Sequence, residues 1–382
     1  MKSYRVAFIG SGFAAHIHAQ AYKKIPGVEV IFHGLFALDK SQAETFAGRY
    51  GFERVYDSLD ELFSDPAVDV IDVIVPPKDH LELVKRGMEQ GKHVICEKPL
   101  NGYFGSGHDD KKKMYETVLA ELEDFREFLE KQKSKFFYAE NFVYAPSVLK
   151  IREFIESTGE KILLLKGEES HSGSHGAHAA HWSVNGGGSL IRQGCHPLSA
   201  LLYLKHCEAR KRNEDIRISS LICDSAAISK VIPPGGKSAI VAKPADVEDW
   251  AELILSFSDG TKAVVSSGDM IVGGVRNSVE AYTPCSCYSA NIAPNDALMV
   301  YHAKGEMISG IYITEKNETG EGWQHVFIAE EEMRGYTGEL ENFLACIEED
   351  REPESGFPLA YDTMRVLYAA YLSAESGERV YF

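Results

Sequence analysis

The stretch Arg5-Val6-Ala7-Phe8-Ile9-Gly10-Ser11-Gly12-Phe13-Ala14-Ala15 decides the fold. The apolar residues before Gly10 predict a short buried strand, and the segment from Phe13 to about Lys24 predicts a helix. Gly10 allows the tight turn, Gly12 lets backbone approach a pyrophosphate, and the small Ala15 permits close packing of helix on strand. The phosphates would lie on the free N–H groups of the helix N-terminus. The pattern predicts a dinucleotide site with four contact residues, Gly10, Gly12, Phe13 and Ala14.

The second strand, expected between Gly27 and Asp39, carries the residues that would distinguish NAD from NADP. An acidic side chain at the end of this strand accepts hydrogen bonds from the ribose hydroxyls of NAD. Ala37 holds the natural position for it, and Asp39 follows two residues later. Asp39 could hold the ribose of NAD, whereas Lys40 and Ser41 could meet the 2′-phosphate of NADP. We expect NAD or NADP, with a slight preference for NAD.

Strands and helices alternate through the first third of the chain. Val68 to Val75 is a continuous apolar run, as expected for a parallel strand that is buried on both faces. Helical patterns lie at 41–50 and 59–63, and a longer one runs from His80 to about Gln90. Alternation with short connections predicts a doubly wound α/β sheet of the Rossmann type.

Lys92-His93-Val94-Ile95-Cys96-Glu97-Lys98-Pro99-Leu100 supplies the first chemical centre. His93 to Cys96 reads as a buried strand, and a Lys just past the carboxyl end of a parallel strand stands where open α/β sheets bind ligands. Pro99 fixes its own φ and biases Lys98 away from the helical region, so the lysine has a rigid support. The alternative is an ordinary strand followed by a surface lysine.

Gly186-Gly187-Gly188-Ser189-Leu190-Ile191-Arg192-Gln193-Gly194-Cys195-His196-Pro197 supplies the second centre. The glycines allow a tight turn into a helix that lies close to another surface. Arg192 and His196 are four residues apart and share a face if the segment is helical. A lone histidine in such a position is more often structural than catalytic.

The motifs together resemble those of the Gfo/Idh/MocA family, the glucose-fructose oxidoreductase and inositol dehydrogenase-like enzymes. The resemblance rests on Gly10-x-Gly12, Val75-Pro76-Pro77-x-x-His80, Glu97-Lys98-Pro99 and the glycine-rich segment, whose order and spacing cover nearly the whole chain. It implies a cofactor site that includes Pro76, His80, Glu97 and Lys98, and it places Lys98 beside the nicotinamide, where it assists catalysis. It also maps the family's acid/base histidine onto His196, whose type of side chain suits proton exchange with an alcohol.

Arg192 departs from the family pattern, which has an Asp four residues before the histidine. An Asp would favour the charged imidazole, whereas an Arg disfavours it. Arg192 could instead bind a substrate carboxylate in bidentate fashion. It could also stabilise a developing oxyanion, or only pair with an acid elsewhere in the chain.

Four histidines, His171, His175, His178 and His181, precede Trp182 at spacings of four, three and three residues. Such a cluster could bind zinc or manganese. It could equally hydrogen-bond sugar hydroxyls while Trp182 stacks on a sugar ring. Gly173 and Gly176 indicate a loop, and the family dehydrogenases need no metal. We expect a metal-free sugar pocket at these substrate-binding residues.

Two domains are expected, an NAD(P)-binding Rossmann domain at 1–140 and a substrate-binding and oligomerisation α+β domain at 141–382. The resemblance points Asn141 and Tyr144 toward the cleft as substrate contacts. Longer alternating strands after residue 162 indicate a large, open, mostly antiparallel sheet, which the resemblance implies builds a homodimer or homotetramer. The polar segment 102–113 could be a lid, a substrate wall, an oligomer contact or a floppy surface insertion.

Composition limits the partners. The 382 residues carry a formal net charge of −17, which argues against a nucleic acid or an anionic membrane surface. Seven scattered cysteines without a disulfide framework predict a reducing, cytoplasmic location. We find no signal peptide and no apolar run of membrane-spanning length.

We therefore expect an NAD(P)-dependent dehydrogenase that transfers a hydride between nicotinamide and a hydroxyl of a sugar, polyol or sugar acid. Lys98, His196 and Arg192 are the expected catalytic side chains. One alternative is redox-neutral glycoside cleavage through a transient keto-sugar, with NAD held throughout. A second alternative is a non-catalytic nucleotide-binding sensor, although retention of Glu97-Lys98-Pro99 and His196 speaks against it.

Overall fold

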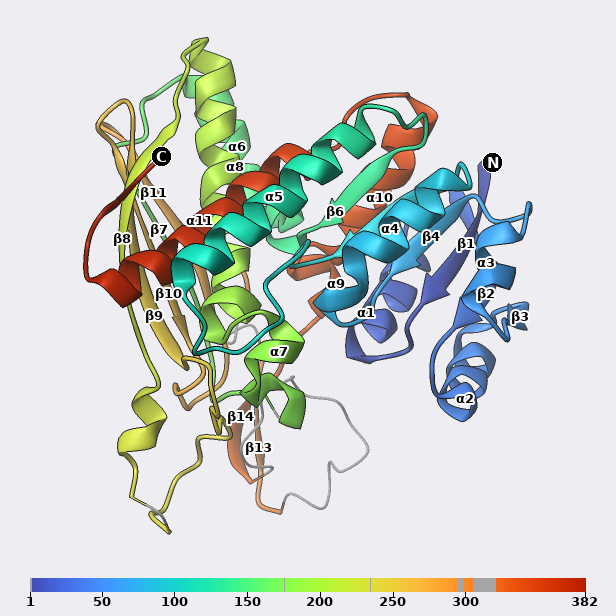
Figure 1. Ribbon diagram of the computed structural model, residues 1–382, viewed down its shortest axis with the longest axis horizontal. Helices are drawn as coiled ribbons and strands as arrows, with labels where there is room; N and C mark the ends of the chain where they lie inside the picture. Colours follow the sequence, from blue (N-terminus) through green and yellow to red (C-terminus); the bar gives the residue numbers. More distant parts are fainter. Residues whose placement is uncertain (1, 175, 234, 294–297, 305–320) are drawn as a thin grey trace.

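The computed structural model describes residues 2–174, 176–233, 235–293, 298–304 and 321–382. Two β-sheets stand at opposite ends of the molecule with helices packed between them (Figure 1). The first sheet is built by the N-terminal part of the chain and the second by the C-terminal part. The site described below lies where the two halves meet.

The first sheet has six parallel strands in the order β3-β2-β1-β4-β5-β6. Its strands are β1 (Lys2–Ile9), β2 (Val28–Phe36), β3 (Arg54–Val55), β4 (Val70–Val73), β5 (His93–Glu97) and β6 (Phe136–Ala139). The intervening helices are α1 (Phe13–Tyr22), α2 (Lys40–Tyr50), α3 (Leu59–Ser64), α4 (His80–Glu89) and α5 (Lys111–Leu129). The strand order reverses between β1 and β4, so the ligand crevice is expected at the carboxyl ends of these strands. The Rossmann prediction is confirmed.

The second sheet has seven strands in the order β12-β11-β7-β10-β9-β8-β15. These are β7 (Leu164–Ser170), β8 (Ile218–Ala226), β9 (Trp250–Phe257), β10 (Lys262–Gly268), β11 (Arg276–Tyr282), β12 (Cys287–Asn291) and β15 (Val380–Tyr381). Only the β7–β10 pair is parallel among the described pairs, which confirms the mostly antiparallel sheet. Two short strands outside this sheet, β13 (Met299–His302) and β14 (Gly322–His325), pair with each other.

Helices α6 (Pro146–Thr158), α8 (Cys195–Arg212) and α11 (Phe357–Ser376) cover the face of the second sheet that looks toward the first (Figure 1). Gly167 packs directly on Pro197 of α8, because a Cβ there would lie 2.8 Å from the proline ring. Along each strand, side chains that face the helices alternate with side chains of the opposite face. Ile254, on that opposite face, is 40% exposed. The sheet therefore has one covered face and one open face.

Helix α10 (Tyr336–Glu348) returns to the first sheet, preceded by the short helix α9 (Glu330–Met333). The hydroxyl of Tyr4 donates to the carbonyl of Leu344, and the ring of Phe343 stacks on Phe137 with centroids 4.9 Å apart. A late segment of the chain thus completes the core around the N-terminal sheet.

The segment before α5 forms a strap between the two halves. Helix α5 begins at Lys111, so it includes the end of the 102–113 segment. Within the strap, the N–H of Gly107 donates to the carboxylate of Asp246 at 3.2 Å, and the carbonyl of Tyr103 accepts from the indole of Trp182 at 2.8 Å. These bonds tie the strap to the second half, unlike a floppy insertion.

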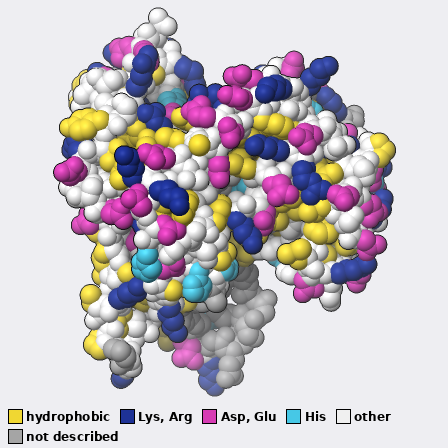
Figure 2. Space-filling model, viewed as in Figure 1, with side chains coloured by type: hydrophobic (Ala, Val, Ile, Leu, Met, Phe, Trp, Pro, Cys, Tyr) yellow, Lys and Arg dark blue, Asp and Glu magenta, His cyan; other side chains and the backbone are white. Residues whose placement is uncertain are grey.

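Acidic and basic side chains are interspersed over the molecular face in Figure 2. In the ranges that the structure describes, no helix combines the length and apolarity needed to cross a membrane. All seven cysteines are free thiols.

Candidate active site

The glycine-rich turn after β1 forms an open cradle at the start of α1. Gly10 has φ +113°, and a Cβ there would lie 2.1 Å from the carbonyl oxygen of Ile74, so only glycine fits. A Cβ on Gly12 would meet no atom within 4 Å. Helix α1 has no side-chain cap and no acidic residue in its first turn, and its N–H groups therefore suit an anion. Phe13 and Ala14 follow in this first turn.

Asp39 and Lys40 lie at the start of α2. The carboxylate of Asp39 caps this helix by accepting from the N–H of Gln42 at 3.0 Å, and Lys40 pairs with Asp57 at 2.5 Å. A cavity of about 450 Å³ between α1 and α2 is lined by Asp39 and also by Arg49, a cation that sequence reasoning did not single out.

His80 joins the ends of two neighbouring strands. Its ring nitrogens lie 2.9 Å from the carbonyl of Val75 and 2.8 Å from the carbonyl of Pro99. Pro76 follows Val75 directly and precedes a short 3₁₀ turn, Pro77–Asp79. The buried imidazole therefore supports the turn that carries Lys98.

A buried charge network lies behind Glu97. His18, fully buried on α1, has one ring nitrogen 2.9 Å from Asp72 and the other 3.1 Å from Glu97. Burial alone would lower the pKa of His18, but the two carboxylates hold it well above its usual value. The second oxygen of Glu97 accepts from the backbone N–H of Lys98 at 3.0 Å. Sequence reasoning missed His18. Its position on the sheet-facing side of α1 is the feature that could have revealed it.

Lys98 projects from the end of β5 toward the second half. Its ammonium donates to the backbone carbonyl of Arg192 at 2.8 Å. Burial opposes the charge, but the carboxylates around it, among them Glu97 and Glu169, keep the pKa of Lys98 above its usual value. The lysine is therefore a buried ammonium group and not a proton acceptor.

The glycine-rich segment is a wide π-helical turn, Leu190–Gly194, that leads directly into α8. The carboxylate of Glu248 anchors it by accepting from the N–H groups of Gly188 at 3.1 Å and Leu190 at 2.9 Å. Gly188 is required there, because a Cβ would lie 1.9 Å from the Glu248 carbonyl. Such π turns are frequent at functional sites. In this one, the carbonyl of Arg192 accepts the hydrogen bond from the Lys98 ammonium.

Arg192 and His196 do not share partners, although they are four residues apart. The His196 ring turns to Glu140, whose Oε1 lies 2.6 Å from Nδ1. It also stacks on Phe142 with a centroid distance of 4.8 Å and an interplanar angle of 20°. Both His196 and Glu140 are buried. Sequence reasoning missed Glu140, although a carboxylate at the end of the last parallel strand, next to β5, is a usable signal.

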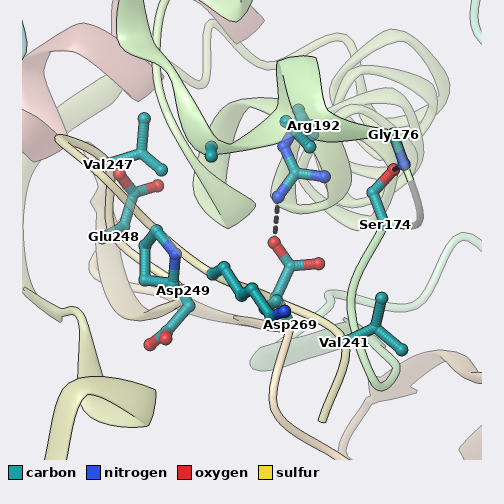
Figure 3. A pocket seen from close by; sticks show the side chains of 13 residues that line it. Ser174, Gly176, Arg192, Val241, Val247, Glu248, Asp249 and Asp269 are labelled. Carbon is teal, nitrogen blue, oxygen red and sulfur yellow. Dashed lines mark hydrogen bonds and ion pairs between the residues drawn. The ribbon is translucent and has the colours of Figure 1, made fainter. Parts of the chain in front are cut away.

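The Arg192 guanidinium points across a cavity to the carboxylate of Asp269, with which it forms an ion pair (Figure 3). Gln193 donates to the same carboxylate at 2.5 Å. The cavity, of about 250 Å³, is walled by Ser174 and Glu248 as well. Of the three roles considered for Arg192, pairing with an acid elsewhere is the arrangement that the structure contains.

The three described histidines of the predicted pocket do not form one cluster. His171 is buried, accepts from the N–H of Gly173 at 2.9 Å and lies 2.8 Å from the Gln193 amide. His178 and His181 are exposed, on and just after a 3₁₀ turn. His175 lies outside the described residues.

Trp182 is buried at 2% exposure, and its ring packs against Tyr371 with centroids 4.7 Å apart. Its indole N–H donates to the carbonyl of Tyr103 in the strap. The ring therefore has no free face for a sugar, and the expected stacking of Trp182 on a sugar ring is not possible in this arrangement.

Asn141 and Tyr144 are also engaged inside the protein. The Asn141 amide donates to the carbonyl of Arg334 at 2.7 Å, and the Tyr144 hydroxyl accepts from the N–H of Ser355 at 2.9 Å. Both side chains hold the C-terminal segments against the short turn after β6. These contacts differ from the expected orientation toward the cleft, and it is the neighbouring Glu140 that contacts His196.

Glu140, Cys195 and His196 form the group among the described residues that could hold a metal ion, with ligand atoms within 4.8 Å of one another. Burial raises the pKa of the Cys195 thiol, so it is protonated. The Lys98 ammonium already lies among these acidic groups. A bound cation would have to compete with that charge.

Residues 4–109 match a family model described as an oxidoreductase family with an NAD-binding Rossmann fold. Two curated relatives match over part of their length. An uncharacterised protein of Saccharomyces cerevisiae, YMR315W, is 29% identical over 42% of each chain, and the levoglucosan dehydrogenase of Pseudarthrobacter phenanthrenivorans is 32% identical over 31% of each chain. The chain therefore aligns with less than half the length of these relatives.

Two solved structures are similar over the whole chain. GenD2 from gentamicin A biosynthesis, in complex with NAD, superposes with a TM-score of 0.77 at 20% identity, covering 100% of this chain and 97% of that one. Levoglucosan dehydrogenase with NADH and levoglucosan gives a TM-score of 0.72 at 20% identity, covering 100% and 99%. At this identity the similarity shows a shared fold for both halves.

Proposed function

We propose that this chain, whose residues 4–109 belong to the Gfo/Idh/MocA family of oxidoreductases, is an NAD(P)-dependent dehydrogenase acting on a hydroxyl of a sugar or polyol. One observation carries the proposal. The Lys98 ammonium at the end of β5 contacts the turn that carries His196, an imidazole held at one nitrogen, beside the cradle of a Rossmann fold. An acid/base and a fixed positive charge at the crevice where such folds bind ligands would support this chemistry.

The glycine-rich cradle fits a dinucleotide. The space above Gly12 is open, the first turn of α1 carries no acidic side chain, and Gly10 is required by its contact with Ile74. A nicotinamide cofactor bound there would supply the hydride acceptor for oxidation of an alcohol. The protein's own residues supply binding, charge and proton transfer.

In this proposal His196 takes the proton of the substrate hydroxyl while the carbon–oxygen bond becomes a carbonyl. Lys98 stabilises the negative charge that develops on that oxygen. A buried ammonium suits this role because low dielectric strengthens its field and burial excludes competing water. In the reverse direction His196 returns the proton to the oxygen.

The Arg192–Asp269 ion pair supports a neutral substrate. A guanidinium already paired with a buried carboxylate has little capacity left for a substrate carboxylate. The relative named as a levoglucosan dehydrogenase agrees with an uncharged sugar or polyol as the substrate. A sugar acid is the less favoured substrate, and it would require Asp269 to release Arg192.

We infer NAD in preference to NADP. Asp39 lines the cavity next to the cradle, where a carboxylate favours ribose hydroxyls and repels a 2′-phosphate. Lys40 is engaged by Asp57. The open face of the second sheet, with Ile254 exposed, supports assembly as a homodimer or homotetramer.

The test is an absorbance assay for reduced cofactor with neutral sugars, polyols, sugar acids and glycosides, each with NAD and with NADP. We expect stoichiometric reduced cofactor with a neutral sugar or polyol. Lys98→Gln should lower kcat/KM by on the order of 100-fold, and the exposed Lys133→Gln should not. Product formed without net reduced cofactor would overturn the dehydrogenase in favour of a redox-neutral cycle.

A further inference from the structure

Glu140 is a buried carboxylate that the sequence motifs do not mark. It follows β6 directly, is fully buried, and has one oxygen 2.6 Å from Nδ1 of His196. Its other oxygen has no hydrogen-bond partner among the described residues. A buried acid with half of its acceptors unused is costly to keep, so its contact with His196 calls for a functional explanation.

We infer that Glu140 is the positioning residue for His196, an inference that rests on the proposed dehydrogenase function. The Nδ1–H of the imidazole donates to the carboxylate, which fixes the tautomer and leaves the Nε2 lone pair available as a base. The Phe142 ring, stacked at 4.8 Å, fixes the plane of the imidazole. No described residue bonds Nε2.

This arrangement defines the path of the substrate proton. The substrate O–H bond would break, its proton would bond to Nε2, and the electron pair left on oxygen would form the C=O bond as the hydride leaves the carbon for a bound nicotinamide. The Nδ1 proton stays on the ring throughout. Glu140 stabilises the imidazolium that forms and does not itself become protonated.

Neither of the other nearby polar groups can do this. Arg192, one turn before His196, gives its carbonyl to Lys98 and its guanidinium to Asp269. Lys98 carries a positive charge that would disfavour an imidazolium, and the carboxylate of Glu140 offsets it. The π-helical turn that leads into α8 thus keeps the Arg192 guanidinium apart from His196, the proposed base.

Glu140→Gln tests the inference, with Glu339→Gln as the matched control. Glu339 is equally buried, and neither of its oxygens has a hydrogen-bond partner among the described residues. We expect Glu140→Gln to lower kcat by on the order of 100-fold, with KM and the cofactor Kd within about threefold. Glu339→Gln should keep kcat within about twofold.

A second measurement does not depend on activity. Nitrogen NMR of the unmodified protein, with ¹⁵N-labelled histidine, should show His196 as the Nδ1–H tautomer, and Glu140→Gln should turn this into a mixture. A Glu140→Gln protein with kcat within threefold of the parent, or an Nε2–H tautomer in the parent, would overturn the inference. So would activity that is lost on chelation and restored by zinc, since Glu140, Cys195 and His196 would then be metal ligands. An inactive parent with the expected tautomer would refute the proposed function alone.

Discussion

Two buried histidines of this protein, His18 and His196, are both bonded to carboxylates, yet they serve different ends. His18 has a carboxylate on each ring nitrogen, Asp72 and Glu97. His196 has Glu140 on one nitrogen only. A histidine held by a carboxylate at each nitrogen is a fixed cation within the structure, whereas one held at a single nitrogen keeps a lone pair for chemistry. The number of engaged nitrogens, and not burial, separates the structural from the reactive imidazole.

The largest expected effect is on stability at the first histidine. His18→Asn leaves Asp72 and Glu97 buried without a compensating charge, and we expect the free energy of unfolding to fall by roughly 3–5 kcal/mol. Denaturant unfolding measures this. A loss below about 1 kcal/mol would show that His18 is not a structural cation.

The opposite outcome is expected at the second histidine. His196→Asn should lower kcat by 10²- to 10⁴-fold, the usual contribution of a general acid or base, and change the free energy of unfolding by only about 1 kcal/mol. Steady-state kinetics and denaturant unfolding on one preparation measure both quantities. Comparable activity of the His18 and His196 variants per folded molecule would break the distinction.

The pH dependence of stability sharpens the comparison. The folded pKa of His18 is raised, so its stabilisation is fully present below its usual value of 6.5 and is lost as pH rises through the folded value. Stability should therefore decline above pH 6.5, by at most about 1.4 kcal/mol per pH unit. The decline should persist in His196→Asn and be shallower in His18→Asn.

Subtracting these two curves removes the contribution of Glu248, whose pKa burial raises to about 7. Parallel curves for the two variants between pH 6.5 and 8.5 would contradict the assignment of the charge to His18.

The smallest effect concerns Arg192, whose guanidinium is paired with the carboxylate of Asp269. Asp269→Asn removes the anion from its guanidinium, and the free guanidinium can then bind a carboxylate. We expect the ratio of kcat/KM for a sugar acid to that for the matching neutral sugar to rise by about tenfold. The double variant Asp269→Asn/Arg192→Gln should lose this gain. An unchanged ratio in the single variant would show that Arg192 does not face the substrate.

Local patterns predicted the scaffold well. The glycine-rich turn, the apolar run at β4 and the strand that ends at Glu97-Lys98-Pro99 each depend on a few consecutive residues, and the Rossmann sheet followed from them. The alternation after residue 162 predicted the second sheet in the same way.

The side-chain partners could not be predicted in the same way, because they come from distant segments. Asp269 lies 77 residues after Arg192, and nothing near either residue indicates the pair. Trp182 was expected at the substrate, but its burial depends on the strap, 79 residues earlier. Glu140 was overlooked in favour of Asn141, its neighbour, because the turn after β6 decides which of the two faces His196.

The return of α10 to the first sheet has a consequence for biosynthesis. The contacts of Leu344 with Tyr4 and of Phe343 with Phe137 join segments separated by about 200 residues or more. At about 5–20 residues per second, a ribosome needs roughly 10–40 s to bridge that interval. During this time the nascent N-terminal sheet leaves apolar surface uncovered, so a chaperone is expected to engage it until the last fifty or so residues have emerged.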